Sequence, residues 1–192
     1  MRRYGWIAIL LVIVLVGGAA FREYRLATQN AEAQATGDAI LSALQSPDQE
    51  ARIAQLGEIE AGGDVGALIA MLLAADDNDA GQAGRARAQL EQIAADPSLS
   101  PRISHLATLK LAMNAPPDAS ADDRLLALSA IAAPGAPYRL LAEEQMALVE
   151  VSDGRAEDAI ARLQLVTQDI EVTSGLRQRA QDVIVALGGT PE

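Results

Sequence analysis

Apolar residues form one uninterrupted run near the start of the chain and recur at helical spacing in the remainder. The run, residues 6–21, contains no charged or strongly polar side chain, and its flanks extend it to residues 4–24. At a rise of about 1.5 Å per residue, about 20 helical residues span the hydrocarbon core of a bilayer. The run therefore predicts one transmembrane helix, within a membrane anchor of residues 1–25.

Beyond the anchor, apolar positions recur every three or four residues in segments bounded by glycine, proline or capping residues, as in amphipathic helices. Aromatic residues make up 3% of the chain, which favours helices over a sheet. We therefore predict an all-α domain over residues 26–192, in which short connections make neighbouring helices antiparallel hairpins. The predicted helices span residues 25–44, 47–61, 64–75, 80–95, 101–113, 124–132, 138–152, 155–168 and 174–187.

Local signals predict the ends of several helices. Ser46 is expected to cap the second helix, with Pro47 in its first turn, and the glycine pair at 62–63 is expected to end it. The acidic segment 76–79 is expected to be a solvated turn rather than a calcium loop, because it lacks the distal bidentate glutamate. Ser100 repeats the Ser-Pro start for the fifth helix.

Aromatic residues and arginines mark both ends of the apolar run. Aromatic rings prefer the headgroup region of a bilayer. Arg2 and Arg3 favour a cytoplasmic amino terminus, whereas Arg22 and Arg25 favour the reverse; we expect the amino terminus in the cytoplasm and the helical domain on the other side. Two alternatives stay open. Gly18 and Ala20 form a small-x-small site for signal-peptide cleavage before Phe21, and the run could be a buried core helix. The predicted membrane-interface anchors are Tyr4, Trp6, Phe21 and Tyr24.

Charge and composition exclude several classes of function. Residues 26–192 hold 25 acidic and 11 basic side chains, which repel nucleic acids and anionic lipids. The chain has no cysteine, and His105 is its one histidine, so a catalytic triad and a multi-histidine metal site are both disfavoured. The adjacent carboxylates 122–123 and 143–144 project from different sides of a helix, which suits solvation better than catalysis. We expect no enzyme activity, no cofactor and no metal.

The most specific local pattern begins at Gly154 and continues as Arg-Ala-Glu-Asp-Ala-Ile between two predicted helices. Glycine permits a tight turn, and a small alanine lets two helices approach closely. The pattern resembles the turn and second helix of a tetratricopeptide repeat. Carried over position by position, this resemblance assigns packing roles to Ala147, Gly154, Ala159, Leu163 and Val166.

The resemblance to that repeat is partial. Glu143 and Glu150 fall where the repeat usually has a large aromatic or apolar residue, and Glu171 replaces its closing proline. The resemblance further implies a groove lined by the first helix of each hairpin, suited to partner segments with basic and apolar side chains. The implied groove positions are Glu144, Leu148, Val151 and Ser152.

Features spread over most of the chain also resemble a bacterial family of membrane-anchored proteins identified as ancillary subunits of the Sec translocon. They are Arg3-Tyr4-Gly5-Trp6, Gly17-Gly18, Arg22-Glu23-Tyr24-Arg25, Gly37-Asp38-Ala39 and Pro134-Gly135-Ala136-Pro137-Tyr138-Arg139. This resemblance implies a single-pass plasma-membrane protein whose repeat domain faces the periplasm and assists newly exported chains.

The expected function is therefore that of a membrane-tethered, chaperone-like interaction module. Its expected partners are proteins, possibly translocon subunits or exported chains, and the bilayer through the first helix, with no nucleic acid and no small-molecule substrate. A structural scaffold for envelope or division complexes is the alternative interpretation, and an envelope hydrolase that uses carboxylates is a weaker one. Neither partner identity nor oligomeric state follows from the sequence.

Overall fold

The computed structural model describes the backbone of residues 5–79, 81–116 and 118–190, together with the side chains of these residues except 5–15 and 79. Over this part of the chain, nine helices form and no strand is present. The prediction of an all-α fold is confirmed for these residues. The chain divides into two compact units, residues 1–61 and 62–192, each described separately below.

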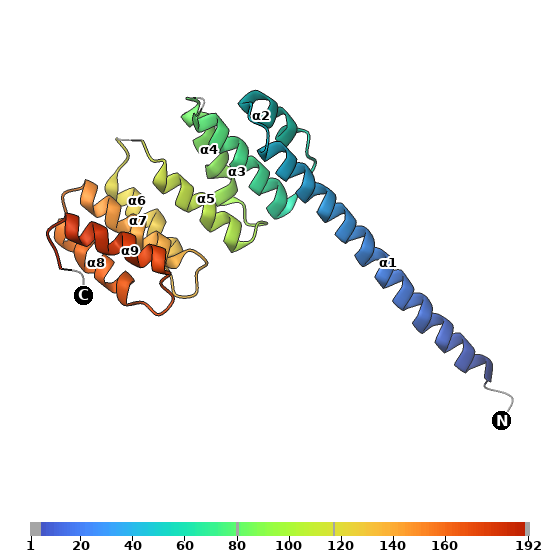
Figure 1. Cartoon of the computed structure of the whole chain (residues 1–192). Coiled ribbons are helices and arrows are strands. Elements are labelled where there is room, and N and C mark those ends of the chain that lie inside the picture. The colour runs from blue at the N-terminus through green and yellow to red at the C-terminus, as the bar shows by residue number, and fades with distance from the viewer. Residues whose placement is uncertain (1–4, 80, 117, 191–192) are drawn as a thin grey trace. The chain divides into compact units, whose positions relative to one another are not determined.

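The first unit consists of a long helix and a short one. Helix α1 (Gly5–Leu44) runs without a break for 40 residues, about 60 Å, and α2 (Gln49–Gly57) folds back against it (Figure 1). The described side chains from Val16 to Ala35 are exposed to solvent. The predicted transmembrane run and the predicted helix over residues 25–44 therefore lie in one continuous helix.

In the part of the chain with described side chains, no helix combines the length and apolar character that a membrane span requires. Most of the predicted anchor lies outside that part, including Tyr4 and the side chain of Trp6. Phe21 and Tyr24 are on α1 and exposed, and the Arg25 guanidinium lies 5.5 Å from the centre of the Phe21 ring. The division of the chain after residue 25 stays a prediction.

Helix α2 begins and ends at other residues than predicted. Its N-cap is Asp48 rather than Ser46, because the Asp48 carboxylate accepts the Ala51 amide at 3.0 Å. The Ser46 hydroxyl donates instead to the Asp48 carbonyl. The helix ends at Gly57, where the following amide bonds back into the last turn. Gly63, predicted as its terminator, begins the next helix.

The second unit is a succession of helical hairpins closed by a single helix. Each helix packs against the next along the chain, and α5 also lies against α3 and α7 (Figure 1). This pattern places odd-numbered helices side by side in one layer, as in a stack of repeated hairpins. The elements are α3 (Gly63–Asp79), α4 (Ala83–Ala95), α5 (Pro101–Met113), α6 (Ala121–Ile131), α7 (Arg139–Ser152), α8 (Ala156–Gln168) and α9 (Ser174–Ala186).

Two predictions about this unit are wrong. The acidic segment 76–79 is the last turn of α3 rather than a solvated turn, and Asp76 and Asp77 are both buried. The chain reverses later, at Gly81, which has a φ of 77°, and the Asp77 carbonyl accepts the Gln82 amide at 2.7 Å. Helix α6 begins three residues earlier than predicted because Ser120 caps it through the amide of Asp123.

Three clusters of buried apolar side chains form the core of this unit, and consecutive clusters share a helix. The first joins α3, α4 and α5, the second joins α5, α6 and α7, and the third joins α7, α8 and α9. The start of α5 is also held to α3, since the Ser100 amide donates to the Asp64 carboxylate at 2.9 Å. The three clusters are therefore separate, but α5 and α7 link them by contributing side chains to two clusters each.

Leu163 tests how strongly the third cluster stabilises the chain. Its side chain is fully buried in that cluster, whereas Leu165 on the same helix is 72% exposed. We expect Leu163→Ala to lower the free energy of unfolding by about 2–5 kcal/mol through lost burial and the cavity left behind. Leu165→Ala is the matched control and should change it by less than about 1 kcal/mol. Urea unfolding followed by circular dichroism measures both, and equal effects would contradict the described core.

Candidate protein-interaction surface

Helices α7 and α8 form the best-defined hairpin, and its turn depends on Gly154. This residue has a φ of 78°, a left-handed conformation that glycine adopts without strain. Its amide donates to the Val151 carbonyl at 3.1 Å, and the Arg155 amide donates to the Glu150 carbonyl at 2.8 Å. These two bonds satisfy carbonyls at the end of α7 and reverse the chain into α8.

The residues assigned to repeat packing come together beside this turn. Ala147 on α7 and Ala159 on α8 are fully buried in the third core cluster, which also contains Leu163 and Val166. Two alanines at this crossing leave room for the helices to approach closely. The cluster is completed by Leu176, Ala180 and Ile184 of α9.

Ion pairs also join α7 to α8, and they involve the two glutamates that depart from the repeat pattern. The Arg162 guanidinium donates to the Glu150 carboxylate at 2.6 and 3.0 Å and to Glu143 at the same time. Glu150 is almost fully buried. These bonds, first those to Glu150, raise the pKa of Arg162. Glutamates are tolerated here because an arginine covers both of them.

A second arginine closes the open end of the hairpin. Arg139 donates to both oxygens of Asp169, at 2.9 and 3.0 Å, and to Glu171 at 2.7 Å. Arg139 stands 15 residues before Gly154 and Asp169 stands 15 after it, so the two meet when the chain folds back at the glycine. Two opposite charges at equal distances before and after the turn glycine could therefore have predicted the ion pair of Arg139 and Asp169 from the sequence.

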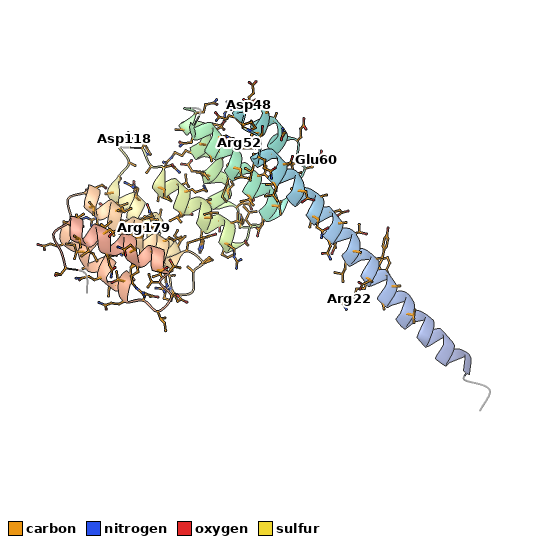
Figure 2. The ribbon with its side chains drawn as sticks, viewed as in Figure 1. Arg22, Asp48, Arg52, Glu60, Asp118 and Arg179 are labelled. Atoms are coloured by element: carbon orange, nitrogen blue, oxygen red, sulfur yellow. The ribbon has the colours of Figure 1, made fainter. Side chains whose placement is uncertain are left out.

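Helix α9 is tied to α7 by a third bidentate pair. Arg179, labelled in Figure 2, donates to the Glu144 carboxylate at 2.7 and 2.8 Å. Glu144 is 8% exposed, so this predicted groove residue is engaged in the packing of α9. Val151, another predicted groove residue, packs against the third core cluster. Residues 144 and 179 are far apart in sequence, and no local pattern links them.

One face of α7 remains exposed after these contacts. It carries Leu141, Gln145, Leu148 and Ser152, whose spacing of three or four residues puts them on one stripe of the helix. Leu141 is 36% and Leu148 is 39% exposed. We call these four residues the inner stripe of α7. The predicted groove residues Leu148 and Ser152 belong to it, whereas Glu144 is bonded to α9 and Val151 packs against the third core cluster. The stripe is consequently aliphatic and uncharged rather than acidic.

Other odd-numbered helices also expose apolar side chains. Val65 and Leu68 are exposed on α3, and Met113 is 59% exposed at the end of α5. His105 on α5 is partly buried, and no hydrogen bond to its Nδ1 is present among the described residues. A layer of helices with solvent-facing aliphatic side chains is the type of surface on which repeat stacks hold extended or helical partner segments.

A comparison with protein families agrees with this architecture. The family model described as a tetratricopeptide repeat-like domain matches residues 2–179. The chain belongs to the tetratricopeptide repeat-like family. Such domains are generally non-catalytic modules that bind other proteins, and the predicted helical repeat is confirmed at this level. No curated protein and no solved structure matches the chain.

The pairing of Arg139 with Asp169 in this tetratricopeptide repeat-like protein predicts a dependence of stability on pH. The Arg139 bonds, followed by that from the Glu171 amide, lower the pKa of Asp169. Because the folded pKa lies below the unfolded value of about 4, the contribution is complete above that value and is lost as pH falls through the folded pKa. We expect the unfolding midpoint to fall on acidification below about pH 4, and Asp169→Asn to reduce this dependence.

Thermal unfolding at several pH values measures this effect. Asp118→Asn is the control, since Asp118 is exposed and no ion pair to it is present among the described residues. The same pH dependence in both variants would contradict the role of the Arg139 pair.

Proposed function

We propose that the chain is a membrane-tethered, periplasmic protein-interaction module that serves as a chaperone-like accessory of the Sec translocon. The observation that carries the interaction role is the inner stripe of α7, an exposed aliphatic face on a tetratricopeptide repeat-like domain. The resemblance to ancillary translocon subunits supports the export role. The proposed location is the bacterial plasma membrane, with a cytoplasmic amino terminus.

The inner stripe suits weak and varied binding of apolar segments. Complete burial of a leucine is worth about 1.5–3 kcal/mol, so covering the exposed parts of Leu141 and Leu148 contributes about 1 kcal/mol each. Tyr138 is the one aromatic residue beyond position 24, and binding hot spots favour aromatic side chains. Modest affinity without strong sequence preference is appropriate for a protein that meets many unfolded or partly folded chains.

A tether would compensate for modest affinity. The proposed anchor is the uncharged run 6–21, bordered by arginines on both sides. Helix α1 continues from residue 5 to residue 44 without interruption, which supports a stiff connection between the anchor and the rest of the chain. A module held at the membrane has a raised effective concentration near other membrane proteins, so weak contacts still lead to useful occupancy.

Charge substitution in the inner stripe tests the interaction role. We expect Leu148→Glu to reduce the recovery of translocon subunits and exported chains about fivefold or more after mild crosslinking and purification in gentle detergent, because a buried contact would receive an unpaired charge. Leu126→Glu is the matched control. Leu126 is an exposed leucine on the even-numbered helix α6, and this variant should bind like the parent chain.

Recovery that is equal for the two variants would overturn the assignment of the stripe. Recovery of division or envelope complexes in place of translocon subunits would favour the scaffold alternative over the export role.

Fractionation tests the tether. We expect the full chain to stay in the membrane pellet after alkaline carbonate extraction, and the helical domain to be digested by protease added to spheroplasts but not to intact cells. Release of the chain into the carbonate supernatant would rule out an integral anchor. Protection from protease in spheroplasts would rule out the periplasmic orientation.

A further inference from the structure

A cleft lies between α7 and α8, separate from the inner stripe, and two of its lining residues, Asp158 and Leu165, have no role in the packing described above. Its cavity volume is about 590 Å³, and all its lining residues come from these two helices or from Asp169 directly after α8. Apolar side chains line part of it, including Leu140 and Val166. Leu165 stands at the cleft with 72% of its surface exposed.

Carboxylates outnumber cations in this cleft. Its lining contains two arginines and four acidic residues, and both arginines are already bonded to two carboxylates each. Arg162 bonds to Glu143 and Glu150, and Arg139 bonds to Asp169 and Glu171. Neither guanidinium therefore neutralises a further carboxylate of the cleft. Asp158 is the remaining acidic residue. Among the described residues, no ion pair neutralises it, and the amino-terminal end of α8 offsets its charge only in part.

One acidic and two apolar residues lie on the side of α8 that faces the cleft. Asp158, Ala161 and Leu165 are separated by three or four residues and share one face of the helix, and Asp169 follows directly after its end. An aliphatic surface beside the uncompensated carboxylate of Asp158, in a lining with more carboxylates than cations, attracts a ligand that is both apolar and cationic. Nucleic acids and anionic lipids would be repelled by the same charges.

We propose that the α7–α8 cleft is a second binding surface, which takes a partner segment that carries an arginine or lysine beside an aliphatic side chain. The aliphatic side chain covers Leu165 and Ala161, and the cation faces Asp158. The cleft and the inner stripe use different side chains of α7, so one hairpin offers an uncharged surface and an acidic one. The cleft's role does not require the translocon partnership or the membrane anchor.

Direct binding to a peptide tests this proposal. The probe is a short fluorescent peptide in which arginine alternates with leucine, and the control peptide has glutamate in place of arginine. Full-length protein in mild detergent is titrated against each, with binding read as fluorescence anisotropy. We expect the arginine peptide to bind, to weaken as salt is raised because exposed charges are screened, and the glutamate peptide not to bind. Equal binding of the two peptides would overturn the proposal.

A matched pair of double variants separates the cleft from the general acidity of the chain. Asp158→Asn with Leu165→Ser should weaken the arginine peptide about tenfold, because it removes one charge contact and one aliphatic contact. Glu157→Gln with Leu126→Ser makes the same changes in charge and apolarity outside the cleft, since Leu126 is also 72% exposed. This control should change binding less than about twofold.

Equal weakening by the two double variants would overturn the cleft assignment, and circular dichroism verifies that both fold. Leu148→Glu in the inner stripe should change binding of the arginine peptide much less than the double variant in the cleft does. A loss of translocon recovery in that variant, with peptide binding retained, would show that the two surfaces act separately.

Discussion

The apolar faces of short helices must be covered by their neighbours, and this constraint determines the rest of the structure. Helices of 11 to 17 residues in the second unit cannot bury an apolar face alone. Each core cluster therefore takes side chains from three consecutive helices, and α5 and α7 each contribute to two clusters. A chain built this way depends on contacts between neighbours, and the loss of one hairpin's core weakens the hairpins on both sides.

Helix α7 shows how one element satisfies several demands. Ala142, Met146 and Val149 pack toward α5 and α6, and Ala147 packs toward α8 and α9. Its acidic side chains are bonded to arginines of α8 and α9. The inner stripe is the part of α7 that these apolar contacts and ion pairs do not use. The surface available for binding is thus what remains after the packing and ion-pair requirements are met.

Charge in this domain contributes to packing, and in our proposal it also contributes to recognition. Buried ion pairs add little net stability compared with apolar contacts, because desolvation offsets most of the attraction, but breaking one leaves a costly unpaired charge. Loss of Arg162 would therefore leave the almost fully buried Glu150 without its partner. Carboxylates in excess of the arginines remain at the α7–α8 cleft, so the negative charge expected in the groove lies on a different side of α7. An uncharged face and an acidic face would let one module hold two kinds of segment.

The sequence alone determined the helical class, the repeat-like arrangement and most helix ends, because caps, glycines and apolar spacing act within a few residues. The ends of α7, α8 and α9 fall within one residue of those predicted, and Gly154 forms the predicted turn. Tertiary structure decided which acidic residues are solvated. Glu150 meets an arginine 12 residues away and Glu144 one 35 residues away, and local patterns carry no information about such partners. These arginines belong to α8 and α9, which follow α7 in the chain. Which face of α7 stays exposed therefore depends on the packing of those helices, and the sequence of α7 alone does not determine it.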